Sequence, residues 1–137
     1  MKELQKLEME LLELAKDGSF IPIIPRKPKR HVIVTSSHGI APCEDTEIEI
    51  VENGEKKILK ITHEYLVAPI TSFVSIKAKC IGIIGTYNRE FSNLDRIEEM
   101  KGYHKALLKV IKFLRRYGDV VILSIHGWDD EKKEKKD

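Results

Sequence analysis

The chain has 137 residues, of which 42% are hydrophobic, and this is enough for one domain with a buried core. Charged residues make up 34%, but 24 Lys and Arg are balanced by 22 Asp and Glu, which leaves a formal net charge of +2. This balance argues against nucleic-acid binders and membrane-surface binders, since both usually carry a clear excess of one sign. No apolar run approaches the roughly 20 residues that a membrane span needs, and no signal peptide is evident.

The two cysteines, Cys43 and Cys80, form no CxxC pair and no disulfide framework. We therefore expect a reduced, cytoplasmic location. The high charge content with few Asn and Gln is typical of heat-adapted proteins and indicates a thermophilic source.

Residues 1–30 are expected to form an N-terminal helix and a connector. Leucines recur at helical spacing up to residue 16, and Asp17-Gly18 ends the helix. This stripe should pack on its own domain, although it could instead pack on a partner chain and make a homo-oligomer. Residues 19–30 contain three prolines and a basic cluster, and they read as an extended, solvated connector.

The remaining elements follow from apolar runs and turn signals. Three short β-branched or apolar runs predict buried strands at 31–36, 80–86 and 119–125. Alternating residues around Asn53-Gly54 predict a hairpin over 46–61. Residues 96–117 form the clearest helix, and 63–79 fit either a helix or strands.

Buried strands separated by helices predict an α/β domain over residues 31–128, with a mainly parallel or mixed sheet flanked by helices. The charged stretch 129–137 has nothing to bury and is expected to be a disordered tail. In such sheets, ligands bind just beyond the carboxyl ends of the strands.

Unusual polar residues stand at three of these strand ends. His38 follows the first strand, Asn88-Arg89 the second and His126 the third. Two imidazoles and one carboxylate are a common catalytic zinc set, and either Glu44 or Asp45 could supply the carboxylate. The alternative is that the two histidines only cap their strands; His31, His63 and His104 lack this context and read as surface or helix-face residues.

These residue types suit hydrolysis of a substrate that carries a carboxylate. Zinc polarises a carbonyl and lowers the pKa of a bound water to about 7. The planar fork of Arg89, with Asn88 beside it, fits a carboxylate of a small-molecule substrate, although Arg89 could instead form an ion pair with a neighbouring acid. Whichever of Glu44 and Asp45 does not ligate the metal could act as a general base.

Three segments, SHGIAPCEDTEIEIV, GTYNREFSNLD and ILSIHGW, resemble the signature segments of the N-formylglutamate amidohydrolase family, in the family's order. The resemblance covers about residues 32–128 and implies a fold like that of zinc carboxypeptidases and phosphorylase-hydrolase proteins. It implies that His38, one of Glu44 and Asp45, and His126 hold one zinc ion. It further implies that Asn88 and Arg89 bind the substrate's carboxylate.

The chain departs from the family in two ways. The loop between His38 and the acidic pair is shorter, and the sequence ends soon after His126, where the family continues through a section with a catalytic glutamate. The sequence therefore predicts a zinc-dependent hydrolase acting on the amide of a small N-acyl amino acid or short peptide. The alternative is a non-catalytic metal- or carboxylate-binding module derived from that fold.

Overall fold

The computed structural model describes residues 2–40, 46–61, 66–86 and 102–126, with the side chains of 38–40, 46–48, 50 and 59–61 excepted. Its elements follow one another as α1 (Lys2–Leu14), the 3-10 turn η1 (Ala15–Asp17), β1 (Phe20–Ile23), β2 (Val32–Ile40), β3 (Thr46–Glu52), β4 (Glu55–Ile61), α2 (Val67–Ala78), β5 (Ile81–Thr86), α3 (Gly102–Arg115) and β6 (Val121–Ser124).

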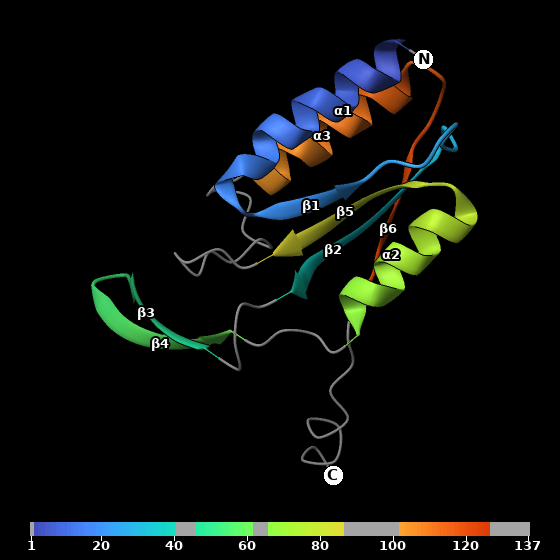
Figure 1. The fold of residues 1–137 in the computed structure, drawn as a ribbon. Helices are drawn as coiled ribbons and strands as arrows, with labels where there is room; N and C mark the ends of the chain where they lie inside the picture. Colours follow the sequence, from blue (N-terminus) through green and yellow to red (C-terminus); the bar gives the residue numbers. More distant parts are fainter. Residues whose placement is uncertain (1, 41–45, 62–65, 87–101, 127–137) are drawn as a thin grey trace.

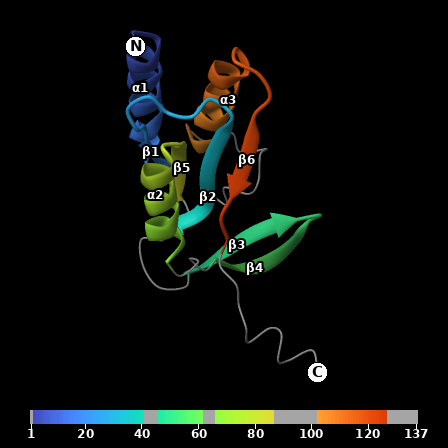
Figure 2. The same cartoon turned by 90° about the vertical axis from the view of Figure 1, so that its right-hand side faces the viewer.

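Four strands form one mixed sheet in the order β1-β5-β2-β6. Strands β5, β2 and β6 run parallel, and β1 pairs antiparallel with β5. Helices α1 and α3 lie side by side on one face of this sheet and α2 covers the other, as Figures 1 and 2 show. This confirms the predicted α/β architecture with a mixed sheet flanked by helices.

The main core lies between the sheet and the pair α1 and α3. Leu7 and Leu11 of α1 are buried in this core, together with strand residues such as Ile33. Alternate side chains of a strand point to opposite faces, so Ile33 and Thr35 face this core while Val34 and Ser36 face α2. The leucine stripe of the first helix therefore packs on its own domain, as the first of the two alternatives predicted.

From the sequence, residues 63–79 fitted either a helix or strands. In the structure they contain helix α2. Pro69 lies in its first turn, where no intrahelical N–H donor is required. Thr71 and Ser75 are fully buried, and each donates its hydroxyl to the carbonyl four residues earlier. The β5 residue Gly82 leaves room for Ser75, because a Cβ at Gly82 would lie 2.2 Å from Ser75 Oγ.

The connector predicted over 19–30 contains a strand that the sequence did not reveal. Residues Phe20–Ile23 form β1 at one edge of the sheet. Pro22 is tolerated there because an edge strand needs hydrogen-bond donors only on its inner side. The four-residue run was too short, and too rich in proline, to be recognised without its partner β5.

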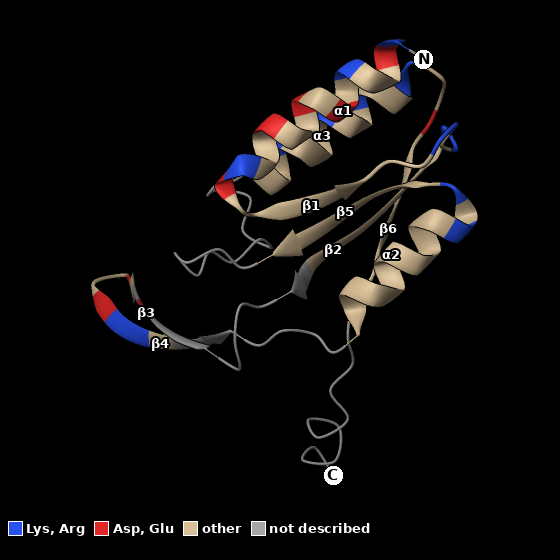
Figure 3. Ribbon diagram, in the orientation of Figure 1, with Lys and Arg blue, Asp and Glu red and all other residues tan. Residues whose placement is uncertain are grey.

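The third predicted strand exists, but it is not buried. Strand β6 lies at the opposite edge from β1, and all four of its residues are exposed. No charged residue occurs in any of the four strands of the sheet, as Figure 3 illustrates. An apolar run alone did not distinguish a central strand from an uncovered edge strand, because burial depends on neighbours distant in the sequence.

The predicted hairpin is confirmed as β3 and β4, which form a separate two-stranded sheet. Its turn residues Asn53 and Gly54 both have positive φ, 54° and 79°, as a tight turn between two twisted strands requires. Strand β2 reaches Ile40 and is therefore longer than predicted. The tail predicted over 129–137 lies outside the described residues.

Candidate functional site

The three strands that precede the predicted site residues are neighbours and run in one direction. Strand β2 is flanked by β5 and β6, both parallel to it. The carboxyl ends of all three strands therefore meet at one edge of the sheet, which we call the carboxyl edge. Sequence reasoning had placed the predicted ligands at strand ends, and the topology makes these strand ends adjacent.

The main chain at His126 lies beside β2. The backbone N–H of the preceding residue, Ile125, donates to the Thr35 carbonyl oxygen over 2.8 Å. The chain thus passes from Ile125 to His126 next to the β2 segment that leads into His38. His38, within β2, and His126, two residues after the end of β6, therefore both lie at the carboxyl edge.

The sequence predicted His38 in a loop after the first strand. In the structure, His38 instead lies within β2. Ser36 pairs with Ile84 of β5 and Ile40 pairs with Thr86, so β2 has two more residues than β5 over this stretch. His38 falls inside this irregularity. Bulges of this kind break the alternation of side chains and often occur beside binding sites, where they redirect a side chain.

The His126 side chain is exposed and in contact with Ser124. Ser124 Oγ lies 3.0 Å from His126 Nε2, and the two residues are separated by one position along the extended chain. Sequence reasoning did not single out Ser124, although a serine in an otherwise apolar strand, two residues before a predicted ligand, was an available signal. The contact restricts the orientation of the imidazole.

A buried hydroxyl lies next to the bulge of β2. Ser36 is fully buried, and its Oγ has no hydrogen-bond partner in the described part of the chain. The β5 backbone passes very close, because a Cβ at Gly85 would lie 2.3 Å from the Ser37 carbonyl oxygen. Within the described residues, the Ser36 hydroxyl is therefore unsatisfied, and it lies two residues before His38.

The core-facing side of the carboxyl edge is built around Tyr103. The Thr35 hydroxyl donates to the Ile83 carbonyl oxygen over 2.9 Å, so the Tyr103 hydroxyl is the donor in its 2.7 Å contact with Thr35 Oγ1. His104, which we expected at the surface or on a helix face, is buried in the first turn of α3. Its ring meets Tyr103 edge to face, with centroids 5.3 Å apart.

Most of the predicted site residues lie outside the described part of the chain. This applies to Glu44, Asp45, Asn88 and Arg89, and the structure describes only the main chain of His38. Among the described side chains, no group of three His, Cys, Asp or Glu is placed to hold a metal ion. The proposed ligand set therefore stays a prediction.

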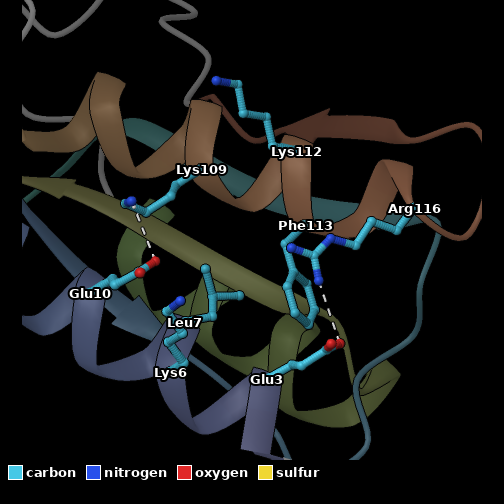
Figure 4. Close-up of a pocket in the computed structure, with 8 residues that line it drawn as sticks. All are labelled: Glu3, Lys6, Leu7, Glu10, Lys109, Lys112, Phe113 and Arg116. Carbon is cyan, nitrogen blue, oxygen red and sulfur yellow. Dashed lines mark ion pairs between the residues drawn. The ribbon is translucent and has the colours of Figure 1, made fainter.

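A pocket of about 410 Å³ lies elsewhere, in the seam between α1 and α3 shown in Figure 4. Two ion pairs cross it, Lys109 to Glu10 at 3.3 Å and Arg116 to Glu3 at 3.4 Å. Glu3 and Arg116 lie at the helix ends away from the carboxyl edge. We interpret this seam as solvated packing between helices rather than as the predicted site.

Comparison with known proteins adds no relative: no family model, no curated protein and no solved structure matches this chain. In the described residues, no helix has the length and apolarity that crossing a bilayer would require.

Proposed function

We propose that this chain is a metal-dependent hydrolase that cleaves the amide bond of a small N-acyl amino acid or short peptide. The proposal is supported by one observation above all, the parallel neighbourhood of β5, β2 and β6. Each of these strands leads into one of the three segments that resemble the N-formylglutamate amidohydrolase signatures. A site assembled from all three segments needs this strand order or one equivalent to it.

His38, His126 and one of Glu44 and Asp45 would hold the metal. The donor set is chemically suited to zinc, which takes imidazole nitrogen and carboxylate oxygen and leaves a position open in catalytic sites. The exposed imidazole of His126, at the end of a strand adjacent to β2, is compatible with this role. When bound, the metal would supply Lewis-acid polarisation of the substrate carbonyl.

The other residues would bind and orient the substrate. Arg89 would form a bidentate pair with the substrate's carboxylate and Asn88 would donate a further hydrogen bond, which together fix the distance from the carboxylate to the scissile amide. The acid of the Glu44 and Asp45 pair that does not ligate would take a proton from the attacking water. Ser124 would limit rotation of the His126 ring.

Metal content tests the proposal most directly. The full chain is purified without an affinity tag, equilibrated with zinc and measured by elemental analysis, and we expect about one zinc ion per chain. His38→Ala and His126→Ala should each lower this ratio well below one. His31→Ala is the matched control, because His31 is an exposed histidine at the opposite end of β2 and should leave the ratio unchanged.

Turnover is measured on the zinc-loaded protein with N-formylglutamate and other N-acyl amino acids, by detecting the released acid. Arg89→Lys should raise KM, since a lysine cannot reproduce the planar fork. Wild-type protein without zinc, or equal zinc in the wild type and both histidine variants, would contradict the proposal. Zinc binding without turnover of any N-acyl amino acid would instead support the binding-module alternative.

A further inference from the structure

Strand β6 is an edge strand that lacks the protection found at the other edge of the same sheet. The strand consists of Val121, Ile122, Leu123 and Ser124, and its three apolar residues are 61%, 44% and 47% exposed. Among the described residues, no strand pairs with its outer side. Exposed apolar edge strands are unfavourable in solution, because their free N–H and C=O groups attract other strands.

The opposite edge shows how this sheet blocks such pairing where it is unwanted. Strand β1 contains Pro22, and the chain continues through Pro25, Pro28 and a group of basic residues. Proline removes a donor from an edge and positive charge repels a second strand of the same kind. Strand β6 has no proline, no glycine and no charge, so the two edges differ in the features that prevent pairing (Figure 3).

The backbone groups at the outer side of β6 can be assigned. The N–H groups of Val121 and Ile125 donate to β2, to the carbonyl oxygens of His31 and Thr35. Because backbone groups alternate along a strand, the N–H and C=O groups of Ile122 and Ser124 point away from β2.

From these observations we infer that β6 pairs antiparallel with β6 of a second copy of this chain, so that two four-stranded sheets join into one continuous sheet across a two-fold axis. With Leu123 on the axis, Ile122 of each copy lies opposite Ser124 of the other and exchanges both backbone hydrogen bonds with it. This register uses the whole segment from Val120 to His126.

The side chains of this segment are complementary to themselves in that register. On the face that α2 covers, Val121 of one copy lies opposite Ile125 of the other, and the two Leu123 side chains meet on the axis. These aliphatic cross-strand contacts are the kind that stabilise antiparallel pairs.

The arrangement also predicts that assembly stops at two copies. An isologous contact uses the same edge of both chains and closes on itself. The only other edge of the four-stranded sheet, β1, carries Pro22 and is not suited to further pairing. Leu7 and Leu11 of the α1 stripe, the alternative surface for contacts with a partner chain, are buried in their own domain.

The experiment is sedimentation equilibrium on the full-length chain over a range of micromolar concentrations. We expect the wild type at twice the mass of a single chain. Ile122→Pro removes one outward N–H without removing a bond to β2, and Leu123→Lys places two like charges on the axis, so each should raise the dimer dissociation constant at least about tenfold. Far-UV circular dichroism should show that both variants remain folded.

Ile21→Lys is the matched control, because Ile21 lies on the other edge strand and its exposed fraction, 45%, is close to that of Leu123, 47%. This control should remain dimeric. A monomeric wild type would overturn the inference. Two results with a dimeric wild type would also overturn the inference. In the first, Ile21→Lys weakens the dimer as much as Leu123→Lys does; in the second, the dimer persists in both Leu123→Lys and Ile122→Pro. Either result would place the contact away from β6.

Discussion

The carboxylate of Asp17 accepts a 2.6 Å hydrogen bond from the backbone N–H of Gly102, which lies 85 residues further along the chain. The other carboxylate oxygen accepts a 2.8 Å bond from the Ser19 N–H. One side chain therefore satisfies a donor in its own turn and a donor at the start of α3. The packing is close, since a Cβ at Gly102 would lie 2.4 Å from the Leu14 carbonyl oxygen. This contact joins the end of the first helix region to the start of the last helix.

We predict that Asp17→Ala lowers the free energy of unfolding by about 1–2 kcal/mol, because it leaves a helix N-terminal donor without its acceptor. Urea denaturation followed by circular dichroism measures the change. Glu13→Ala is the control: Glu13 forms an exposed ion pair with Lys16, and loss of this pair should cost less than about 0.5 kcal/mol. Equal losses in the two variants would show that the Asp17 contact does not stabilise the fold.

The buried pair of Thr35 and Tyr103 gives a second prediction. Tyr103→Phe should cost about 1 kcal/mol of unfolding free energy because it removes one buried hydrogen bond. Thr35→Val should cost about 1–3 kcal/mol, since it also removes the donor to the Ile83 carbonyl oxygen. Thermal denaturation of both single variants and the double variant gives the coupling between them.

Tyr117→Phe serves as the comparison for Tyr103→Phe, because Tyr117 is an exposed tyrosine on the segment after α3. Its unfolding free energy should stay within about 0.5 kcal/mol of the wild type. If Tyr103→Phe is no more destabilising than this comparison, the assigned hydrogen bond makes no net contribution.

For the unsatisfied hydroxyl of Ser36, in contrast, we predict that its removal does not lower the free energy of unfolding. Replacing a buried polar atom that lacks a partner should not destabilise, so Ser36→Ala should leave stability unchanged or raise it by up to about 1 kcal/mol. Ser75→Ala, equally buried but with a hydroxyl bonded to the Thr71 carbonyl oxygen, should lose about 1 kcal/mol. The two melting temperatures are compared in the same buffer.

If Ser36 belongs to the proposed site, its replacement should lower turnover or zinc affinity while the protein stays at least as stable. A clear loss of stability in Ser36→Ala would indicate that the hydroxyl forms a hydrogen bond that stabilises the fold.

The contact between Ser124 and His126 predicts an effect on metal binding. Partners that orient a ligand commonly contribute about 10-fold or more to metal affinity, so Ser124→Ala should weaken zinc binding by about that factor and leave its stoichiometry unchanged. Competition titration with a zinc chelator dye measures the affinity. Tighter binding in the variant would instead mean that the Ser124 hydroxyl competes with zinc for Nε2.

The sequence by itself determined the elements whose signals are local. The leucine spacing and Asp17-Gly18 gave the first helix and its end, Asn53-Gly54 gave the hairpin, and the apolar run 80–86 gave a buried strand. The α/β class with a mixed sheet followed from the alternation of strands and helices. These features depend on backbone preferences and hydrophobic periodicity, which act over a few neighbouring residues.

Only the tertiary structure decided which strands are neighbours and how far each is covered. In the structure, Phe20–Ile23 pairs with β5 as strand β1, and the apolar strand β6 remains exposed at the other edge. His38 lies in a bulge of β2 rather than in a loop. The tertiary structure also brought Asp17 to Gly102 and buried His104. The physical reason is that burial and strand pairing depend on partners distant in the chain, whose positions no local pattern encodes.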